Sequence, residues 1–476
     1  MVILLALCAR VSRDVGKLTM FTKFGPKKHY VQRRHSMQLS RWFKTTCAVV
    51  ATGGLVLGTA GRTIADVKAG DTITKENMAS AEEFLTPAMK WYVTNGMPMK
   101  IVDYKKIEWP KAFKEATEKY AGQVKISADG RDIFNYVAGA PFPQIDPNDP
   151  LVGFKIMWNQ EQKPAYTDNV GTEWIVELIN SKGEMERRYS SGFWRRMMWT
   201  GRLYSDPKPV VPHNPAMRYT EQFGPLFEPN DLKGAGVLSN RYMAADMPDD
   251  SYMYLPELRR VRRISVSNRS DAFWGTDYDL DALWGFNSKV GFWTFRLLAE
   301  KEILAPMHAG GYGKRIACKP SDGTHGTLAF MPCGLNWEKR KVWVVEGLPT
   351  AFSQYAFSKR IMYIDKDTMG VIFMEAYDQG GELWRVFFNM FDYSKKPYDG
   401  YPARGIDGAK YNYEDEWAFD PHGMTADLQT SHGSPWDAPS GYAKPADWVN
   451  EWYFNESTPI NTAEAFSINN LIQSAR

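Results

Sequence analysis

The chain has 476 residues, of which 44% are hydrophobic and 24% are charged, so it contains enough apolar material for a large core. Its formal net charge of +3 is unevenly distributed, because residues 1–65 hold eleven of the 58 basic residues and one of the 55 acidic residues. The remaining chain has 47 basic and 54 acidic residues, a net charge of −7. A body of this charge argues against binding nucleic acid through a general excess of positive charge.

The first 65 residues have the pattern of an export leader. Arg41 and Lys44 follow Met37 and precede a short apolar run, and Ala65 completes a small-x-Ala cleavage site. The run is shorter than the about 20 apolar residues that a transmembrane helix needs. We therefore expect signal-peptide cleavage near Ala65.

This interpretation divides the chain into three parts. Residues 1–36 are an upstream extension, residues 37–65 a cleaved signal peptide, and residues 66–476 a single exported domain. A mitochondrial transit peptide is the alternative for the leader, because the stretch is rich in arginine and poor in acid. No cysteine stands directly after the apolar run, where a lipid-attachment site would need it, so we expect no lipid anchor.

Two cysteines remain after removal of the leader, Cys318 and Cys333. In an exported protein, two cysteines fifteen residues apart most simply form one disulfide, which stabilises by about 3 kcal/mol. Their spacing does not match the CxxC pairs of zinc sites. We expect a disulfide and no metal at these residues.

The first elements are expected to be helical, and the later ones to be strands. Apolar periodicity predicts one helix over 77–93, capped by Asn77, and a second over 109–122 with Pro110 in its first turn. Period-two runs with short turns between them then predict antiparallel hairpins. The pairs are 172–180 with 184–199, 251–255 with 259–266, and a three-stranded meander over 359–391.

Four arginines in five positions characterise the second of these hairpins. Alternation places Arg260, Arg262 and Ile264 on one side and Arg259, Val261 and Arg263 on the other, so neither face is purely basic. Acidic residues nearby are expected to neutralise part of the charge: Glu257, Asp271, Asp277, Asp279 and Asp281. Three interpretations remain open: salt bridges at the sheet rim, contact with an anionic head group, and nucleic-acid binding.

Aromatic side chains are unusually dense on or beside the predicted strands. The stretch DAFWGTDYDLDALWGFNSKVGFWTF, residues 271–295, mixes aromatics with glycines and polar turns, which is typical of the lining or lid of an apolar cavity. Ordinary core packing is the alternative for each residue. The candidate ligand-binding residues are Trp194, Trp199, Phe273, Trp274, Trp284, Phe286 and Trp293, with Arg259, Arg260, Arg262 and Arg263 as candidates for an anionic head group.

Catalytic and metal motifs are weak. Asp277-x-Asp279-x-Asp281 begins like a calcium loop but lacks the required glycine and glutamate. A loose set could bind a metal: Asp420, His422, Asp427 and His432. Three of these, Asp420, His422 and His432, could instead serve a hydrolase or isomerase. Polar turn residues between two short strands are the favoured explanation of this set, and we expect no catalytic residue, metal or cofactor.

Several segments together resemble a known family. They include NYVAGAPFPQIDPNDP, YLPELRRVRRISVSNRSDAFWGTD, WVVEG, KRIMYIDKDT and YDQGGELWR, and they lie between about residues 70 and 455. The chain is similar in these to the exported Gram-negative family known as domain of unknown function 1329 (DUF1329), often labelled outer-membrane lipoprotein-sorting protein.

The resemblance implies both a fold and a function. The fold is mainly β, a large curved antiparallel sheet or incomplete barrel with helices covering an apolar cavity, like the periplasmic carriers LolA and LolB. The expected function is a non-enzymatic periplasmic carrier for a lipid or other hydrophobic molecule, with only peripheral membrane contact and no nucleic acid. RND-type exporters and outer-membrane proteins are expected partners.

A second function class stays open, an envelope scaffold that docks on such a partner. Its support is the polar, Tyr- and Gly-rich stretch at residues 392–417, which has no regular period and is typical of a binding loop.

Overall fold

The computed structural model describes residues 67–265, 268–309, 328–350, 355–394, 417–438, 453–454 and 461–475. The leader predicted at residues 1–65 lies outside the described residues, as do Cys318 and most of the stretch 392–417. Cys333 is disulfide-bonded. Because Cys318 is not described, its pairing with Cys333 stays a prediction.

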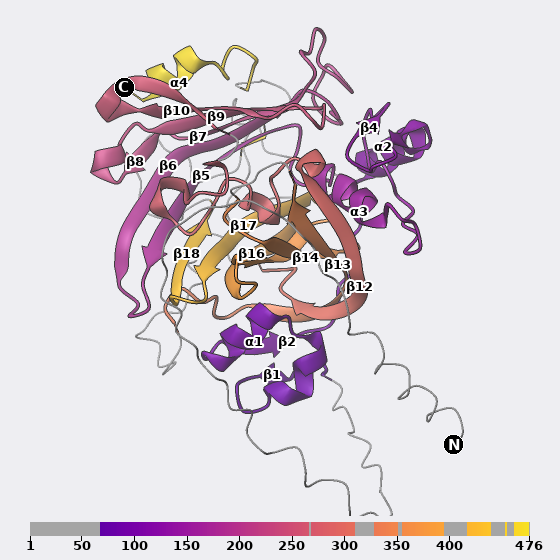
Figure 1. The fold of residues 1–476 in the computed structure, drawn as a ribbon, viewed down its shortest axis with the longest axis vertical. Coiled ribbons are helices and arrows are strands. Elements are labelled where there is room, and N and C mark those ends of the chain that lie inside the picture. Colours follow the sequence, from indigo (N-terminus) through magenta and orange to yellow (C-terminus); the bar gives the residue numbers. More distant parts are fainter. Residues whose placement is uncertain are drawn as a thin grey trace, which may run out of the picture. The chain divides into compact units, whose positions relative to one another are not determined.

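Short helices and many strands alternate along the chain (Figure 1). The strands are β1 (Thr72–Ile73), β2 (Met99–Ile101), β3 (Lys125–Ile126), β4 (Ile133–Phe134), β5 (Asn169–Ile179), β6 (Met185–Met198), β7 (Met217–Phe223), β8 (Leu226–Glu228), β9 (Gly236–Tyr242), β10 (Asp250–Leu255), β11 (Arg260–Ile264), β12 (Trp293–Ala305), β13 (Asn336–Pro349), β14 (Lys359–Asp365), β15 (Val371–Tyr377), β16 (Leu383–Ser394), β17 (Trp417–Asp427), β18 (His432–Asp437) and β19 (Tyr453–Phe454). The α-helices are α1 (Pro87–Thr94), α2 (Lys111–Tyr120), α3 (Val152–Glu161) and α4 (Ile468–Ser474). The 3₁₀ turns are η1 (Met78–Phe84), η2 (Ala121–Gln123), η3 (Asn230–Leu232), η4 (Pro256–Leu258), η6 (Phe273–Gly275), η7 (Leu283–Gly285) and η8 (Val290–Phe292).

One large sheet dominates the fold. Its neighbouring strands run antiparallel in the order β11-β10-β9-β7-β6-β5-β18-β17-β16-β15-β14-β13-β12. The short strands attach to this order: β8 to β6, β19 to β5, and β2 to the end of β13. Within the described residues no pairing joins β11 to β12, so the sheet is open. The prediction of a mainly β protein with an incomplete barrel is confirmed.

The hairpins predicted from turn chemistry are confirmed. β5 pairs with β6, β10 pairs with β11, and β14, β15 and β16 form the predicted meander. Each turn lies where polar or glycine residues interrupt a period-two apolar pattern. At the β10–β11 turn, Arg259 takes a left-handed conformation (φ 48°) after the 3₁₀ turn at Pro256–Leu258.

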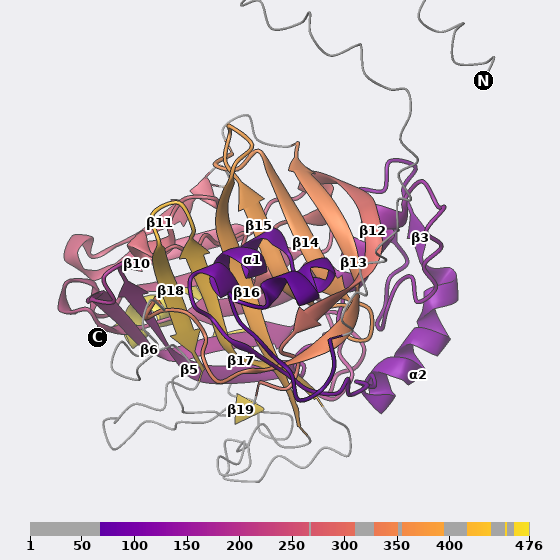
Figure 2. The same ribbon diagram turned by 90° about the horizontal axis from the view of Figure 1, so that it is seen from below.

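Both faces of the central strands are buried. On β14, Met362 and Ile364 join one apolar cluster, whereas Ile361 and Tyr363 join another on the opposite face. The N-terminal elements η1 and α1 cover the second face, and Figure 2 shows α1 lying across the strands. The first face is covered by α3 and by residues 268–292, which we call the aromatic loop.

The helix prediction was right for one segment and wrong in part for the other. α2 forms as predicted, with Phe113 and Ala116 buried. The single helix predicted over 77–93 is instead divided into η1 and α1. The division follows from Pro87, because a residue before proline is disfavoured in helical conformation, and Thr86 is extended and caps α1. No helix among the described residues has the length and apolar character needed to cross a bilayer.

Candidate functional site

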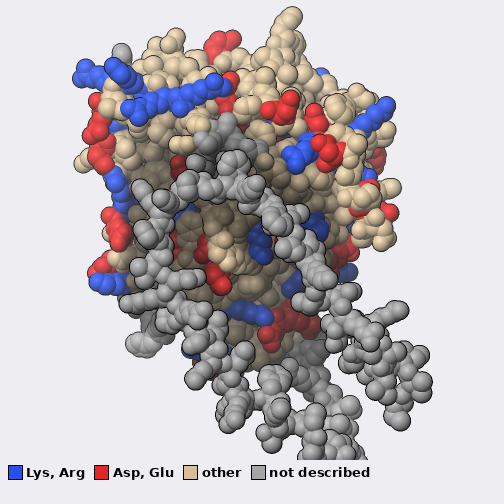
Figure 3. Space-filling view, in the orientation of Figure 1, with Lys and Arg blue, Asp and Glu red and all other residues tan. Residues whose placement is uncertain are grey.

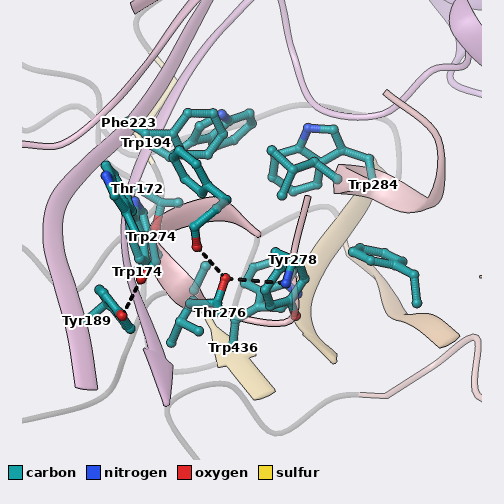
Figure 4. A pocket seen from close by; sticks show the side chains of 15 residues that line it. Thr172, Trp174, Tyr189, Trp194, Phe223, Trp274, Thr276, Tyr278, Trp284 and Trp436 are labelled. Atoms are coloured by element: carbon teal, nitrogen blue, oxygen red, sulfur yellow. Dashed lines mark hydrogen bonds between the residues drawn. The ribbon is translucent and has the colours of Figure 1, made fainter. Parts of the chain in front are cut away.

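An apolar cavity lies between the first face of the sheet and the aromatic loop (Figure 4). Its volume is about 70 Å³. The sheet contributes Thr172, Trp174 and Val176 from β5, Tyr189 and Trp194 from β6, Phe223 from β7, Phe387 from β16, and Trp436 from β18 with the following Ala438. The aromatic loop contributes Phe273, Trp274, Thr276, Tyr278, Leu283 and Trp284.

Aromatic contacts join the loop to the sheet around this cavity. The ring of Trp274 stacks on Phe273 with centroids 4.0 Å apart, and it lies nearly parallel to Trp174 at 6.1 Å. The ring of Trp284 lies 4.9 Å from Trp194 and 5.9 Å from Trp436. Each aromatic pair adds about 0.5–1.5 kcal/mol beyond area burial. These contacts close the loop over the sheet, and the space left between them is almost wholly apolar.

The two loop tryptophans occupy equivalent, strained turns. The segment DAFWG (271–275) and the segment DALWG (281–285) repeat one motif ten residues apart. Trp274 has a φ of 52° and Trp284 a φ of 59°, and the glycine after each also has positive φ. Positive φ is unfavourable for a bulky L-residue and costs on the order of 1–3 kcal/mol. Because strain of this kind persists only where the surroundings hold it, the repeated turns indicate a segment shaped for the cavity.

The glycine after Trp284 is required for two reasons. Its φ of 82° favours glycine, and a Cβ added there would lie 2.6 Å from Val371 of β15. Gly285 thus lets the backbone of the second turn approach the sheet closely. This close approach places Trp284 over the cavity.

Two aspartates fix the aromatic loop to strands of the sheet, and a third holds the loop internally. Asp277 accepts a hydrogen bond from Ser434 of β18, and Asp279 pairs with Arg360 of β14 (2.8 Å). Asp281 pairs with Arg269 (2.6 Å), which lies in the aromatic loop itself. The Tyr355 hydroxyl also donates to Asp281. The Asp-x-Asp-x-Asp pattern that resembles the start of a calcium loop is therefore a set of anchors. The prediction that these aspartates neutralise the arginines of β11 was therefore wrong.

His432 adds a titratable anchor to the same loop. Its Nδ1 lies 2.8 Å from Asp277 Oδ2, and its Nε2 lies 3.3 Å from Glu186 of β6. The hydrogen bond with Asp277 raises the pKa of His432 above its usual value, and Glu186 contributes in the same direction. The imidazole thus connects the aromatic loop to β18 and β6.

We expect this anchor to make stability depend on pH. A raised folded-state pKa gives stability that is fully present below the unfolded pKa of about 6.5 and is lost as pH rises through the folded pKa. The melting temperature of wild type relative to His432→Gln should therefore fall as pH rises from about 6 through the folded pKa. Thermal melts of both proteins across this range test it, and parallel pH profiles would rule the anchor out.

Four of the predicted ligand-binding residues line the cavity: Trp194, Phe273, Trp274 and Trp284. Trp199 is not among the lining residues. It belongs to a separate cluster with Leu471 of α4, and its indole donates to Thr220. Trp194 and Trp199 are an odd number of residues apart, which directs their side chains to opposite sides of the sheet.

Two other predicted residues lie in the core beside the cavity. Phe286 packs edge to face against Trp293 at 5.5 Å, and Trp293 is fully buried. The sequence analysis missed the contributions of β5, β7 and β18, including Trp174, Phe223 and Trp436. The DA-x-WG repeat was a signal in the sequence that could have identified the two tryptophan turns of the aromatic loop.

The four predicted head-group arginines form a basic edge, which we define as Arg259, Arg260, Arg262 and Arg263. All four are exposed, and three lie on the edge strand β11. Arg263 pairs with Asp250. Met253 of β10 is the cross-strand neighbour of Arg262, and Met253 and Ile264 both pack against the apolar cluster that contains the cavity. Because Arg260, Arg262 and Ile264 alternate along β11, the side chains of Arg260 and Arg262 lie on the same face of the sheet as the cavity. Figure 3 shows basic side chains in a run along the upper edge, over β10.

The loose histidine and aspartate set does not converge. His422 Nδ1 lies 2.5 Å from Asp437, whereas His432 contacts Asp277 and Glu186. Asp427 accepts from the indole of Trp384 instead. Asp420 lies in β17, where its side chain is outside the described part. Within the part of the chain that the structure describes, no group of three or more His, Cys, Asp or Glu side chains could hold a metal ion.

Comparison with known families assigns the chain. The family model described as "Protein of unknown function (DUF1329)" matches residues 72–448, well over half of the sequence. The chain belongs to this family. The predicted resemblance to DUF1329 is therefore confirmed, and every residue of the apolar cavity lies inside the matched range.

Individual relatives have low sequence identity to this chain. Uncharacterized protein PA3922 of Pseudomonas aeruginosa is 23% identical over 331 residues, which cover 66% of this DUF1329 chain and 68% of that protein. A DUF1329 family protein from Desulfovibrio piger is 14% identical with a TM-score of 0.40, covering 66% of this chain and 96% of the other. LolA superfamily protein NE2245 from Nitrosomonas europaea is 10% identical with a TM-score of 0.35, and the match covers 66% of this chain and 97% of that protein.

Proposed function

We propose that this protein is a non-enzymatic periplasmic carrier that holds the apolar chain of a lipid or another hydrophobic molecule. The observation that carries the proposal is the apolar cavity, walled by aromatic rings from five strands of one sheet and by the aromatic loop. Burial is worth about 0.8 kcal/mol per methylene, so a twelve-carbon chain gains roughly 10 kcal/mol before ordering costs. That gain allows useful affinity without polar contacts to the chain.

The aromatic loop must move for such a ligand to enter. The cavity volume of about 70 Å³ is smaller than the roughly 150 Å³ cavity known to admit benzene. The loop contains two strained tryptophan turns, and Asp277 and Asp279 join it to β18 and β14. We propose that Trp194, Phe273, Trp274 and Trp284 contact the chain while Phe286 and Trp293 support the loop from behind.

Native mass spectrometry after gentle extraction from the periplasm tests the carrier function. We expect co-purified lipid, and we expect a fluorescent fatty acid to bind and to be displaced by unlabelled acyl chains. Recovery of lipid-free protein from several lipid-rich preparations, together with no binding of the fluorescent fatty acid, would exclude the carrier function.

The partners of the carrier are proposed as an RND-type exporter or an outer-membrane protein. The basic edge supports docking, because β11 pairs with a neighbour on one side only within the described residues and exposes four arginines. A scaffold that only docks would retain its partner after the cavity is filled by bulky residues, whereas a carrier would lose it. Pull-down with cavity-filled protein separates the two classes.

Export and the disulfide have their own test. We expect the mature protein to begin near Asp66 and to contain a disulfide between Cys318 and Cys333, because the leader ends in a small-x-Ala site and two cysteines remain. Intact mass of the periplasmic protein, with and without reduction and alkylation, measures both. Retention of residues 37–65, or two thiols that alkylate without reductant, would contradict the prediction.

A further inference from the structure

A second, polar space adjoins the apolar cavity. It has a volume of about 60 Å³ and shares the side chain of Trp284 with the cavity. We call it the polar chamber. Its lining residues are Glu161, Lys163, Ala165, Tyr166, Thr167, Arg196, Met198, Arg218, Tyr219, Trp284, Phe286, Asn287 and Phe391.

Two arginines of the chamber retain hydrogen-bonding capacity. Arg196 donates through Nε and Nη2 to Glu221, and Arg218 donates through Nε to Gln162 and through Nη1 to Glu161. Nη1 of Arg196 and Nη2 of Arg218 have no hydrogen-bond partner among the described residues. The buried indole nitrogen of Trp284 is likewise without a partner there. These three donors thus belong to side chains that line one small space.

Positive charge exceeds negative charge around the chamber. Three bases and one acid line it: Lys163, Arg196, Arg218 and Glu161. Two nearby carboxylates that do not line the chamber already form ion pairs. Glu221 pairs with Arg196, and Asp249 pairs with Arg241 at 2.7 Å. Arg241 also reaches Glu161, and Lys289 lies close enough to Asp249 and Glu161 to interact with both. An excess of buried positive charge is costly unless an anion balances it.

The pairing of the two spaces defines a ligand class. We infer that the carrier's ligand is a single-chain anionic amphiphile, with its chain in the apolar cavity and its carboxylate or phosphate head group in the polar chamber beside Arg196 and Arg218. Guanidinium groups suit this role, because their planar donors match carboxylate and phosphate oxygens. Trp284 lies at the boundary, where its ring faces the chain and its N–H is available to the head group. This inference rests on the carrier function and names its ligand.

The basic edge is the alternative site for a head group. Its arginines are exposed and well hydrated, so each contact there contributes less than a contact in a buried chamber. Arg196 and Arg218 are largely buried, with side chains 14% and 10% exposed. The burial difference favours the chamber.

Binding of three matched ligands tests the inference: dodecanoate, dodecyl phosphate and the neutral dodecanol, each measured by displacement of a fluorescent fatty acid at pH 7.5. We expect wild type to bind an anion about tenfold or more tightly than dodecanol, because charge-assisted hydrogen bonds supply that factor. The stronger of the two anions identifies the head group as carboxylate or phosphate. Equal affinity for anions and dodecanol would overturn the inference while leaving the carrier function intact.

Variants locate the head group. Arg196→Gln combined with Glu221→Gln removes the buried pair without leaving an unpaired charge, and it should abolish the anion preference while dodecanol affinity stays unchanged. Lys163→Gln, at a half-buried position, should weaken anions severalfold even if the double variant fails to fold. Arg260→Gln with Arg262→Gln is the matched control and should keep the preference. If the preference disappears in the control instead, the head group lies at the basic edge and the chamber assignment is wrong; if no ligand binds wild type, the carrier function itself fails.

Discussion

Replacing Arg360 by methionine should lower the free energy of unfolding by about 3–5 kcal/mol. Arg360 is fully buried on β14, and its Nη2 donates to Asp279 of the aromatic loop at 2.8 Å. Methionine would leave the Asp279 carboxylate buried without its cation. Guanidinium chloride unfolding at pH 7 measures the change.

The surroundings of Arg360 explain why the expected loss of stability is large. Its guanidinium lies 5.4 Å from the ring centroid of Trp293, 5.5 Å from Tyr355 and 4.9 Å from Phe357, so aromatic rings rather than water surround the charge. Burial raises the pKa of Asp279 even beside the guanidinium. A carboxylate in this position has no solvent to stabilise it once the arginine is gone.

A paired variant distinguishes loss of the cation from loss of packing. Arg360→Met combined with Asp279→Leu removes both charges, and we expect it to recover most of the lost stability, since apolar replacement of a buried pair is often neutral or stabilising. A double variant as unstable as the single one would show that the shape of Arg360, and not its charge, holds the loop. A single variant costing less than about 1 kcal/mol would show that the pair is not a major anchor.

Filling the apolar cavity should nearly abolish binding of acyl chains. Val176 of β5 lines the cavity beside Trp174, and Val176→Trp would occupy space that the chain needs. Excluding three methylenes costs about 2.4 kcal/mol, so the affinity for dodecanoate and for dodecanol should each fall by about fiftyfold or more. Fluorescent fatty-acid displacement measures both ligands.

The control for this variant adds the same side chain elsewhere. Leu348 on β13 is 41% exposed, so Leu348→Trp adds a tryptophan at the surface and should leave both affinities within about twofold. Near-wild-type melting of Val176→Trp confirms that the fold is retained. Unchanged binding in a folded Val176→Trp protein would place the ligand outside this cavity.

The two binding experiments answer separate questions. Val176→Trp affects charged and neutral chains alike, because the cavity contacts only the chain. The Arg196 and Glu221 double variant affects only anionic ligands, because the chamber contacts only the head group. Together they test the apolar and polar halves of the proposed site independently.

The sequence by itself determined the family and the local construction of the sheet. Turns such as Ser181-Lys182-Gly183 join adjacent strands, so period-two runs and turn residues sufficed to predict β5 with β6, β10 with β11, and the meander β14 to β16. α2 was predictable for the same reason, because its apolar stripe and its initial proline are local features. Pro87 was an equally local signal for the break before α1, and the helix prediction did not use it.

Only the tertiary structure decided which aromatic residues surround one cavity. Trp436 of β18 lies next to β5 in the sheet although about 260 residues separate it from Trp174, and local patterning does not specify such a pairing. The same limit applies to charges: Asp279 was expected near the arginines of β11 but pairs with Arg360, and Arg196 and Arg218 were not singled out at all. Alternation determines the face on which a side chain lies, whereas the long-range order of strands determines its neighbours, and the proposed site is built from those neighbours.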